Sequence, residues 1–244
     1  MSDTHIAAII LAGGKGTRLQ SVVSDRPKAL AEVAGRPFVE WLVLFLRAHG
    51  VQCVILATGY KGEMVEAHVG DGAPWGLDVR YARETVPLGT GGAARHALQV
   101  GVSDPVLVLN GDSFCPFDVA RLADAHRRAG ARATLWLIPM DDCRRYGAVD
   151  VAGDGRVLAF QEKSLAPRAG LVSAGVYLLQ RSVLEDIPTD RAVSLETEVF
   201  PALIGRGLYA VVGAGPFLDI GTPASYSRAE TFFSENRWLW HADL

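Results

Sequence analysis

The chain has 244 residues, of which 49% are hydrophobic and 21% charged, a composition typical of a globular protein with a core of its own. Its formal net charge is −3, which argues against a broad basic surface and against a nucleic-acid partner. Cys53, Cys115 and Cys143 are odd in number and widely spaced, so they favour reduced thiols in a cytoplasmic protein over a disulfide framework or a zinc ribbon. No run has the length of a membrane span, and we expect no membrane partner and no signal peptide.

Apolar runs alternate with helical patterns in the first half of the chain. Residues 6–11 are continuously apolar and end in glycines, which is typical of a strand buried on both faces. A helix is predicted from Pro37 to Gly50, another over 61–69, and a third after Gly91-Gly92. Further strands are predicted over 51–57, 77–82 and 106–109. This order predicts a doubly wound, mostly parallel α/β sheet whose ligands bind beyond the carboxyl ends of the strands.

The second half has a different pattern. Apolar segments at 149–151 and 157–160 flank Gly153-Asp154-Gly155, which indicates a β-hairpin. A strand is predicted over 172–179 and a helix over 195–204, and Pro223 is expected to begin the last helix. We therefore expect a smaller, mixed β region beside the main sheet.

A glycine-rich loop follows the first predicted strand. It reads Leu11-Ala12-Gly13-Gly14-Lys15-Gly16-Thr17-Arg18-Leu19, with Pro27-Lys28 downstream. Glycines let backbone N–H groups approach an anion, and the three basic side chains add positive charge, so the segment suits a triphosphate. It lacks the Walker A spacing, and Leu19 replaces the third glycine of a dinucleotide fingerprint. On this cluster alone, a tight turn with solvated basic residues remains an alternative.

The same loop resembles the signature of the sugar nucleotidyltransferases, or NDP-sugar pyrophosphorylases. The resemblance extends along nearly the whole chain and implies a Rossmann-like nucleotidyltransferase fold with a smaller mixed β region for the sugar. Its further elements, in family order, are Pro87-Leu88-Gly89-Thr90-Gly91-Gly92-Ala93, Asn110-Gly111-Asp112, Tyr146-Gly147, Glu162-Lys163, Ser173-Ala174-Gly175-Val176-Tyr177 and Asp219-Ile220-Gly221-Thr222-Pro223.

The resemblance implies a reaction in which a sugar phosphate oxygen attacks the α-phosphorus of a nucleoside triphosphate and pyrophosphate leaves, with Mg²⁺ held by Asp112 and Asp219. Arg18, Lys28 and Lys163 would then be the catalytic cations that neutralise the reacting phosphates. The implied nucleotide-binding residues are Leu11, Ala12, Gly13, Gly14, Lys15, Gly16, Thr17, Glu84, Pro87, Gly89, Thr90 and Asn110. The implied sugar-phosphate-binding residues are Tyr146, Gly147, Glu162, Lys163, Ala174 and Gly175.

Each acidic or basic residue also has a simpler interpretation. Asp112 could cap a turn, Asp219 could cap the helix near Pro223, and Glu162 and Lys163 could be solvated strand residues. The joint occurrence of all the elements in family order favours the site. Arg144-Arg145 could form part of the sugar-phosphate pocket beside Tyr146, but we interpret them as a solvated charged pair. We interpret Cys115 as a small buried hydrophobe.

Glu84 lies three residues before Pro87, where the family places the group that contacts the base. A carboxylate only accepts hydrogen bonds, so it can meet the adjacent N1–H and N2–H donors of guanine with two parallel bonds. Uracil and thymine offer one donor between acceptors, which suits an amide better. Glu84 therefore favours GTP over UTP, and a solvated loop carboxylate is the alternative.

We expect one domain over 1–244, in which 1–140 mainly binds the nucleotide, 141–222 mainly the sugar phosphate, and 223–244 forms a C-terminal helix and tail. Within the family, the short chain, Glu84 and the segment Arg145-Tyr146-Gly147 are most similar to guanylyltransferases that use D-glycero-α-D-manno-heptose 1-phosphate, which implies GDP-heptose as product. Mannose or N-acetylmuramic acid 1-phosphate, or UTP or dTTP as donor, remain alternatives. A non-catalytic nucleotide-sensing subunit is a further one. The resemblance is compatible with a homo-oligomer.

Overall fold

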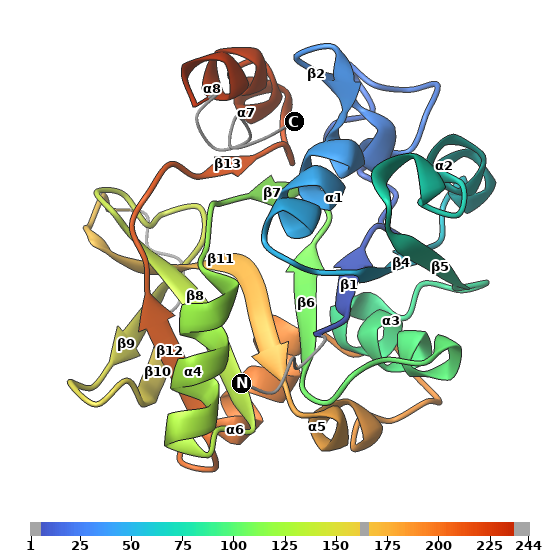
Figure 1. The fold of residues 1–244 in the computed structure, drawn as a ribbon. Helices are drawn as coiled ribbons and strands as arrows, with labels where there is room; N and C mark the ends of the chain where they lie inside the picture. The colour runs from blue at the N-terminus through green and yellow to red at the C-terminus, as the bar shows by residue number, and fades with distance from the viewer. Residues whose placement is uncertain (1–5, 162–165, 237–244) are drawn as a thin grey trace.

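A computed structural model of the chain describes residues 6–161 and 166–236. A central seven-stranded sheet dominates it (Figure 1). Six strands run in one direction and only β11 runs against its neighbours β6 and β8, so the predicted mostly parallel sheet is confirmed. In spatial order the strands are β12 (Leu208–Val212), β8 (Ala133–Met140), β11 (Gly170–Leu179), β6 (Val106–Asn110), β1 (Ala8–Leu11), β4 (Cys53–Thr58) and β5 (Asp78–Arg83).

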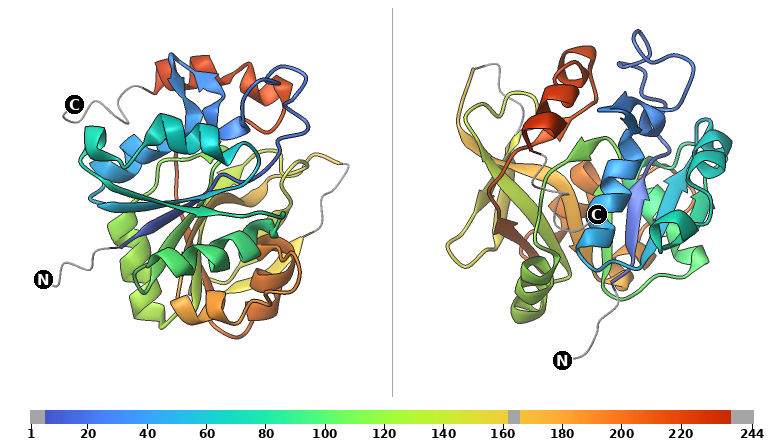
Figure 2. Two further views of the ribbon diagram at one scale, coloured as in Figure 1. Left: turned by 90° about the vertical axis from the view of Figure 1, so that its right-hand side faces the viewer. Right: turned by 45° about the horizontal axis from the view of Figure 1, so that its top comes forward.

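Strand β1 is apolar throughout because helices cover both faces of the sheet. Ile10 points into one core and Ile9 into the other, as the alternation of strand side chains requires. Figure 2 shows the sheet between the two helical layers. The core of Ile10 is completed by α1 (Phe38–Ala48), α2 (Gly62–Val69), α4 (Val119–Ala129) and α8 (Ala229–Glu235), and that of Ile9 by α3 (Gly89–Ala97), α5 (Arg181–Glu185) and α6 (Phe200–Leu203).

Two predicted helices differ from their expected bounds. The segment expected as one helix over 195–204 is a π-helical turn, Leu195–Val199, followed by the short α6, in which Pro201 stands in the first turn. Helix α3 begins at Gly89, before the glycine pair that was expected to precede it. The carbonyl of Val193 accepts hydrogen bonds from Gly91 N–H (2.8 Å) and Gly92 N–H (3.3 Å), which supports this glycine-rich helix start from outside the helix.

No helix or strand was predicted over residues 113–147, where the structure has β7 (Ser113–Phe114), α4 and β8. The ends of α4 did carry a local signal. The side chain of Asp118 accepts the Arg121 N–H at 2.9 Å as an N-cap, and Gly130 ends the helix in the left-handed conformation with φ +55°. Strand β8 is buried from Ala133 to Ile138 and apolar there except for Thr134.

The hairpin expected around Gly153–Gly155 is confirmed as β9 (Ala148–Val151) and β10 (Val157–Gln161). The expected strand over 172–179 forms β11, which has a break in register between Ser173 and Tyr177. Because β11 and β12 join β8 and β6, the large sheet takes strands from both the 1–140 and the 141–222 segments.

Two short antiparallel ribbons lie at the upper edge of the sheet in Figure 1. Strand β2 (Glu32–Val33) pairs with β3 (Arg36–Pro37), and β7 pairs with β13 (Leu218–Asp219). The helix expected at Pro223 is present as α7 (Pro223–Tyr226), with a capping box between Thr222 and Ser225, and α8 follows it. No helix within the described ranges has both the length and the apolar character to cross a membrane.

Helix α8 is anchored by Phe233, whose ring contacts Phe38, Trp41 and Phe114 at centroid distances of 4.4–6.3 Å. Phe233→Ala should lower stability by about 3–5 kcal/mol, the usual cost of such a cavity. In a chain of this size the melting temperature should fall by roughly 6–20 °C. Met64→Ala, on the exposed side of α2, is the control and should change it by only a degree or two, in line with the ~0.5 kcal/mol of surface substitutions. Equal melting curves for the two variants would contradict this assignment.

Candidate active site

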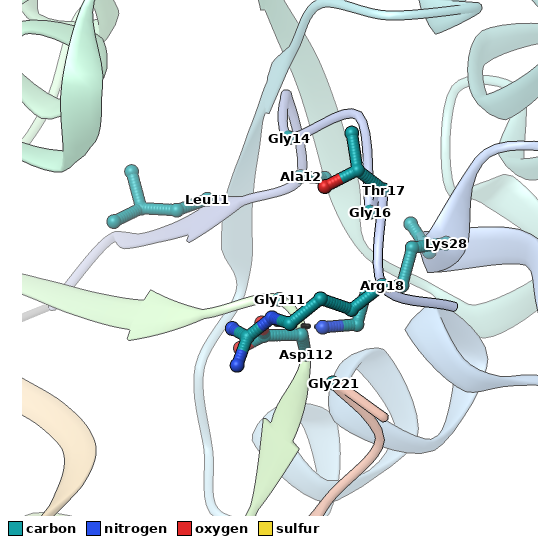
Figure 3. Close-up of a pocket in the computed structure, with 11 residues that line it drawn as sticks. Leu11, Ala12, Gly14, Gly16, Thr17, Arg18, Lys28, Gly111, Asp112 and Gly221 are labelled. Atoms are coloured by element: carbon teal, nitrogen blue, oxygen red, sulfur yellow. Dashed lines mark hydrogen bonds and ion pairs between the residues drawn. The ribbon is translucent and has the colours of Figure 1, made fainter. Parts of the chain in front are cut away.

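The glycine-rich loop surrounds a cavity beyond the carboxyl ends of β1 and β6, where the strand order predicts a ligand (Figure 3). In this view the side chains of Arg18 and Lys28 extend toward Asp112. Most of the predicted loop residues form the wall, whereas Lys15 is exposed and lies outside it. The lining residues are Leu11, Ala12, Gly14, Gly16, Thr17, Arg18, Lys28, Ala29, Gly111, Asp112 and Gly221.

The glycines at this cavity differ in what they make room for. A Cβ on Gly111 would lie 2.5 Å from the backbone oxygen of Leu11, so glycine is needed there for the close approach of two chain segments. A Cβ on Gly14 would meet no protein atom within 4 Å. Protein packing therefore does not require glycine at position 14, and Gly14 is one of the residues that line the cavity.

Glu84 lies directly beside the glycine loop. A Cβ on Gly13 would fall 2.5 Å from Oε1 of Glu84, and one on Gly59 would fall 2.7 Å from the same atom. The Leu88 N–H donates to Oε2 at 3.1 Å and fixes the orientation of the carboxylate. Burial raises the pKa of Glu84 above its usual value, and the hydrogen bond from Leu88 offsets part of that rise.

The second predicted loop packs against the chain around Val193. A Cβ on Gly89, which has φ +73°, would lie 2.5 Å from the Val193 carbonyl oxygen. Oγ1 of Thr90 donates to Oε2 of Glu196 at 2.6 Å and accepts the Leu195 N–H at 2.9 Å. Pro87 is exposed. These contacts give Gly89 and Thr90 a structural role, and their predicted contact with a nucleotide stays a prediction.

The two predicted metal ligands are brought together by the pairing of β7 with β13. Asp219 pairs with Ser113 across this ribbon, and Ile220 N–H donates to the carbonyl of Asp112 at 2.9 Å. Each carboxylate has a cationic partner. Lys28 Nζ lies 2.6 Å from Asp112 Oδ2, and an Arg145 nitrogen lies 2.7 Å from Asp219 Oδ2.

The carboxylate oxygens of Asp112 and Asp219 are donors of the kind that Mg²⁺ prefers. Mg²⁺ is commonly held by one or two carboxylates, with substrate phosphates and water completing the coordination. No third acidic, histidine or cysteine side chain joins them in the part of the chain that the structure describes. The backbone N–H of Gly221 donates to Asp219 Oδ1 at 2.5 Å and holds that carboxylate in place. The metal role of both residues stays a prediction.

A second, larger cavity adjoins the first and shares Arg18 and Asp112 with it. The predicted residues Tyr146, Gly147, Ala174 and Gly175 line it, as do Asn110 and Asp219, whereas Glu162 and Lys163 lie outside the described residues. Asn110 was expected with the nucleotide, but it lines this cavity, and its buried Oδ1 has no partner among the described residues.

Two charged residues that line the larger cavity, Arg145 and Glu196, were not among the predicted site residues. The interpretation of Arg144-Arg145 as a solvated pair is wrong for Arg145, which lines the cavity and binds Asp219, whereas Arg144 pairs with Asp142 on the surface. Arg145 reaches Asp219 only because the chain folds back through β13, and adjacent sequence carries no sign of that.

Glu196 is the second missed residue. Its Oε1 accepts the hydroxyl of Tyr177 at 3.1 Å, and its Oε2 accepts the hydroxyls of Thr90 and Ser194 at 2.6 and 3.1 Å. Burial, followed by the nearby Glu196 carboxylate, raises the pKa of Tyr177 well above its usual value, so its hydroxyl stays a donor. Glu196 therefore joins the second glycine loop to β11.

The fold agrees with comparisons to known proteins. Residues 7–236 match the model of the nucleotidyl transferase family, and the chain belongs to that family. It is 40% identical over 231 residues to a mannose-1-phosphate guanylyltransferase of Mycobacterium tuberculosis, covering 93% of this chain and 64% of that protein, so it spans just under two thirds of that relative. It is 36% identical over 224 residues to a D-glycero-alpha-D-manno-heptose 1-phosphate guanylyltransferase of Aneurinibacillus thermoaerophilus, covering 91% and 96%. The crystal structure of HddC from Yersinia pseudotuberculosis complexed with GMP-PN has a TM-score of 0.81 at 32% identity, covering 93% of this chain and 99% of that one.

Gly14→Ala should separate ligand binding from stability. Because the added methyl meets no protein atom, the melting temperature should stay within about 1 °C or rise slightly, as expected for glycine replaced without strain. The methyl should obstruct a triphosphate and raise its KM on the order of tenfold or more. The matched variant Gly111→Ala should instead lower the melting temperature by about 2–12 °C, since overpacking costs about 1–3 kcal/mol. Unchanged triphosphate binding in Gly14→Ala would show that the loop does not hold phosphates.

Proposed function

We propose that this protein is a guanylyltransferase that transfers the GMP group of GTP to a sugar 1-phosphate and releases pyrophosphate. The observation that carries the proposal is that two adjoining cavities share Arg18 and Asp112. A triphosphate on the glycine loop and a sugar phosphate in the larger cavity would therefore meet at these two residues. The names of the relatives, two guanylyltransferases and a protein crystallised with GMP-PN, support GTP as the donor.

In this proposal the protein acts by positioning and by neutralising charge. The phosphate oxygen of the sugar attacks the α-phosphorus, and the bond to the bridging oxygen of pyrophosphate breaks, so no covalent intermediate with the protein is needed. Arg18 stabilises the charge on the departing pyrophosphate. Lys28, whose side chain is 12% exposed, holds the reacting phosphates from beneath the loop. Lys163 is proposed to hold the sugar phosphate and Glu162 to accept bonds from sugar hydroxyls.

Asp112 and Asp219 are proposed to hold Mg²⁺, with the phosphates of the substrates as its other ligands. The ion would neutralise charge on the phosphates that react. Lys28 pairs with Asp112 and Arg145 with Asp219, so each proposed metal ligand has a cation beside it. We also propose a cytoplasmic location, which suits the three free cysteines.

The acceptor is proposed to be D-glycero-α-D-manno-heptose 1-phosphate, and mannose 1-phosphate is the second candidate. The names of the relatives favour both sugar phosphates, and the rings of the two sugars have the same manno configuration. A panel of GTP, UTP and dTTP with heptose, mannose, glucose and N-acetylmuramic acid 1-phosphates, read out by pyrophosphate release, tests donor and acceptor together. Turnover should be highest with GTP and a manno-configured sugar. Absence of pyrophosphate release across the panel would instead favour a non-catalytic, nucleotide-sensing protein.

Asp112→Asn tests the proposed metal site. The amide keeps the shape of the side chain but loses the negative charge, so Mn²⁺ binding should weaken and turnover with Mg²⁺ should fall by orders of magnitude. Mn²⁺ affinity, kcat and the melting temperature are measured together, with Asp124→Asn on the exposed face of α4 as the control. If Asp112→Asn retained near-normal turnover, Asp112 would not be a metal ligand.

Glu84→Gln tests the proposed contact with the base. A hydrogen bond to a charged group contributes about 1.5–3 kcal/mol, so the wild-type protein should prefer GTP over UTP by roughly tenfold to several hundredfold in kcat/KM. The glutamine amide can both donate and accept, and it should narrow that ratio because it can also meet uracil. Both ratios are measured with one sugar phosphate. A wild-type preference for UTP would overturn the guanylyl assignment, and an unchanged ratio in Glu84→Gln would place the base contact elsewhere.

A further inference from the structure

Arg145 links the two proposed substrate sites. Its guanidinium lies 2.7 Å from Asp219 Oδ2, and it also forms part of the wall of the larger cavity. Among the described residues that line that cavity, Arg18 and Arg145 are the only lysines or arginines. Arg18 borders the glycine-loop cavity as well, where it is assigned to the triphosphate. Of the two described cations in the larger cavity, Arg145 is therefore the one available to bind a second phosphate.

Arg145 and Asp219 each have other contacts, which remain available when the ion pair between them breaks. Its Cζ lies 5.4 Å from the ring centroid of Tyr146, a cation–π contact that does not depend on the carboxylate. The Tyr146 hydroxyl donates to the same Oδ2 at 3.3 Å, and the Gly221 N–H donates to Oδ1. Asp219 thus stays hydrogen-bonded when the guanidinium moves.

We propose that Arg145 exchanges partners during binding, pairing with Asp219 in the free protein and with the phosphate of the sugar 1-phosphate in the substrate complex. The proposal rests on the proposed function, because it assumes that Asp219 holds a divalent cation and that the larger cavity takes a sugar phosphate. A cation approaching Asp219 competes with Arg145, and the displaced guanidinium is then available to the phosphate. Arginine suits this task because its planar fork can meet either a carboxylate or a phosphate with two parallel bonds.

Two consequences distinguish this exchange from a structural ion pair. Removing the charge of Arg145 should strengthen divalent-cation binding, because a competitor for Asp219 is lost, while it weakens sugar-phosphate binding. In addition, the cation and the sugar phosphate should each strengthen the binding of the other through Arg145, since such coupling is reciprocal. An arginine that only held the fold together would weaken both kinds of binding or neither.

The experiment compares the wild-type protein with Arg145→Gln, Arg145→Lys and the control Arg144→Gln, whose arginine pairs with Asp142 on the surface. Mn²⁺ affinity without substrates is measured from the free-ion EPR signal. Arg145→Gln should bind Mn²⁺ more tightly than wild type, by roughly 1.5-fold to fivefold for one competing surface ion pair. Its KM for mannose 1-phosphate or heptose 1-phosphate, at saturating GTP and Mg²⁺, should rise by about tenfold to a hundredfold. The KM for GTP should change by less than about threefold, because GTP binding does not use this side chain.

Arg145→Lys separates the two roles. A lysine keeps the positive charge beside Asp219, so Mn²⁺ affinity should stay near that of wild type, but it loses the paired hydrogen bonds to the phosphate and should still raise the KM of the sugar phosphate. Arg144→Gln should match wild type in every measurement. The exchange is overturned if Arg145→Gln binds Mn²⁺ no more tightly than wild type, or if its KM for the sugar phosphate is unchanged while the wild-type protein is active. If the wild-type protein itself transferred no nucleotide to any sugar phosphate, the proposed function would fail first, and the exchange with it.

Discussion

The site depends on the pairing of two very short strands, β7 and β13. This ribbon brings Asp219 beside the segment that carries Asp112, although the two residues lie far apart in the sequence. The ribbon is held from behind by apolar packing, since Phe114 is buried against Phe45 and Phe233. Two residue pairs could not hold such a ribbon alone, because an isolated short hairpin is marginally stable in water. The hydrophobic core therefore determines the separation of the two carboxylates.

Glycine has two different uses around the glycine loop and the second loop. At Gly111 and Gly89, the missing side chain lets one backbone segment contact another, with Leu11 and Val193 as the respective partners. At Gly14, the missing side chain leaves space that no protein atom fills. A close backbone contact would select glycine in a protein without any ligand, whereas Gly14 lines the cavity and leaves room there for one.

Charge is concentrated in this small region of a chain whose net charge is only −3. Arg18, Lys28 and Arg145 converge on Asp112 and Asp219, and two of these cations are already paired with the carboxylates. The Lys28 side chain is 12% exposed and that of Asp219 17% exposed, so water screens their charges less than it would screen those of fully solvated pairs. A binding event here must rearrange existing ion pairs, which makes the binding of one charged ligand sensitive to the presence of another.

The sequence by itself determined the parallel strands β1, β4 and β6, because strands buried on both faces are continuously apolar. Strand β5 lies at the edge of the sheet, and its buried and exposed residues alternate. The sequence also indicated the anion-binding loop, since the glycines and basic residues that such a loop needs are contiguous in the chain. It did not assign α4 and β8, although Asp118 and Gly130 mark the ends of that helix.

Only the tertiary structure decided which residues lie together at the two cavities of the site. Arg145 meets Asp219, and Glu196 meets Thr90 and Tyr177, through contacts between segments that are distant in the sequence. It also placed Asn110 in the larger cavity and gave Gly89 a packing partner in Val193. The physical reason is that residue type and periodicity report the local burial of a segment, whereas a side chain's partner depends on which distant segment the packed core places beside it.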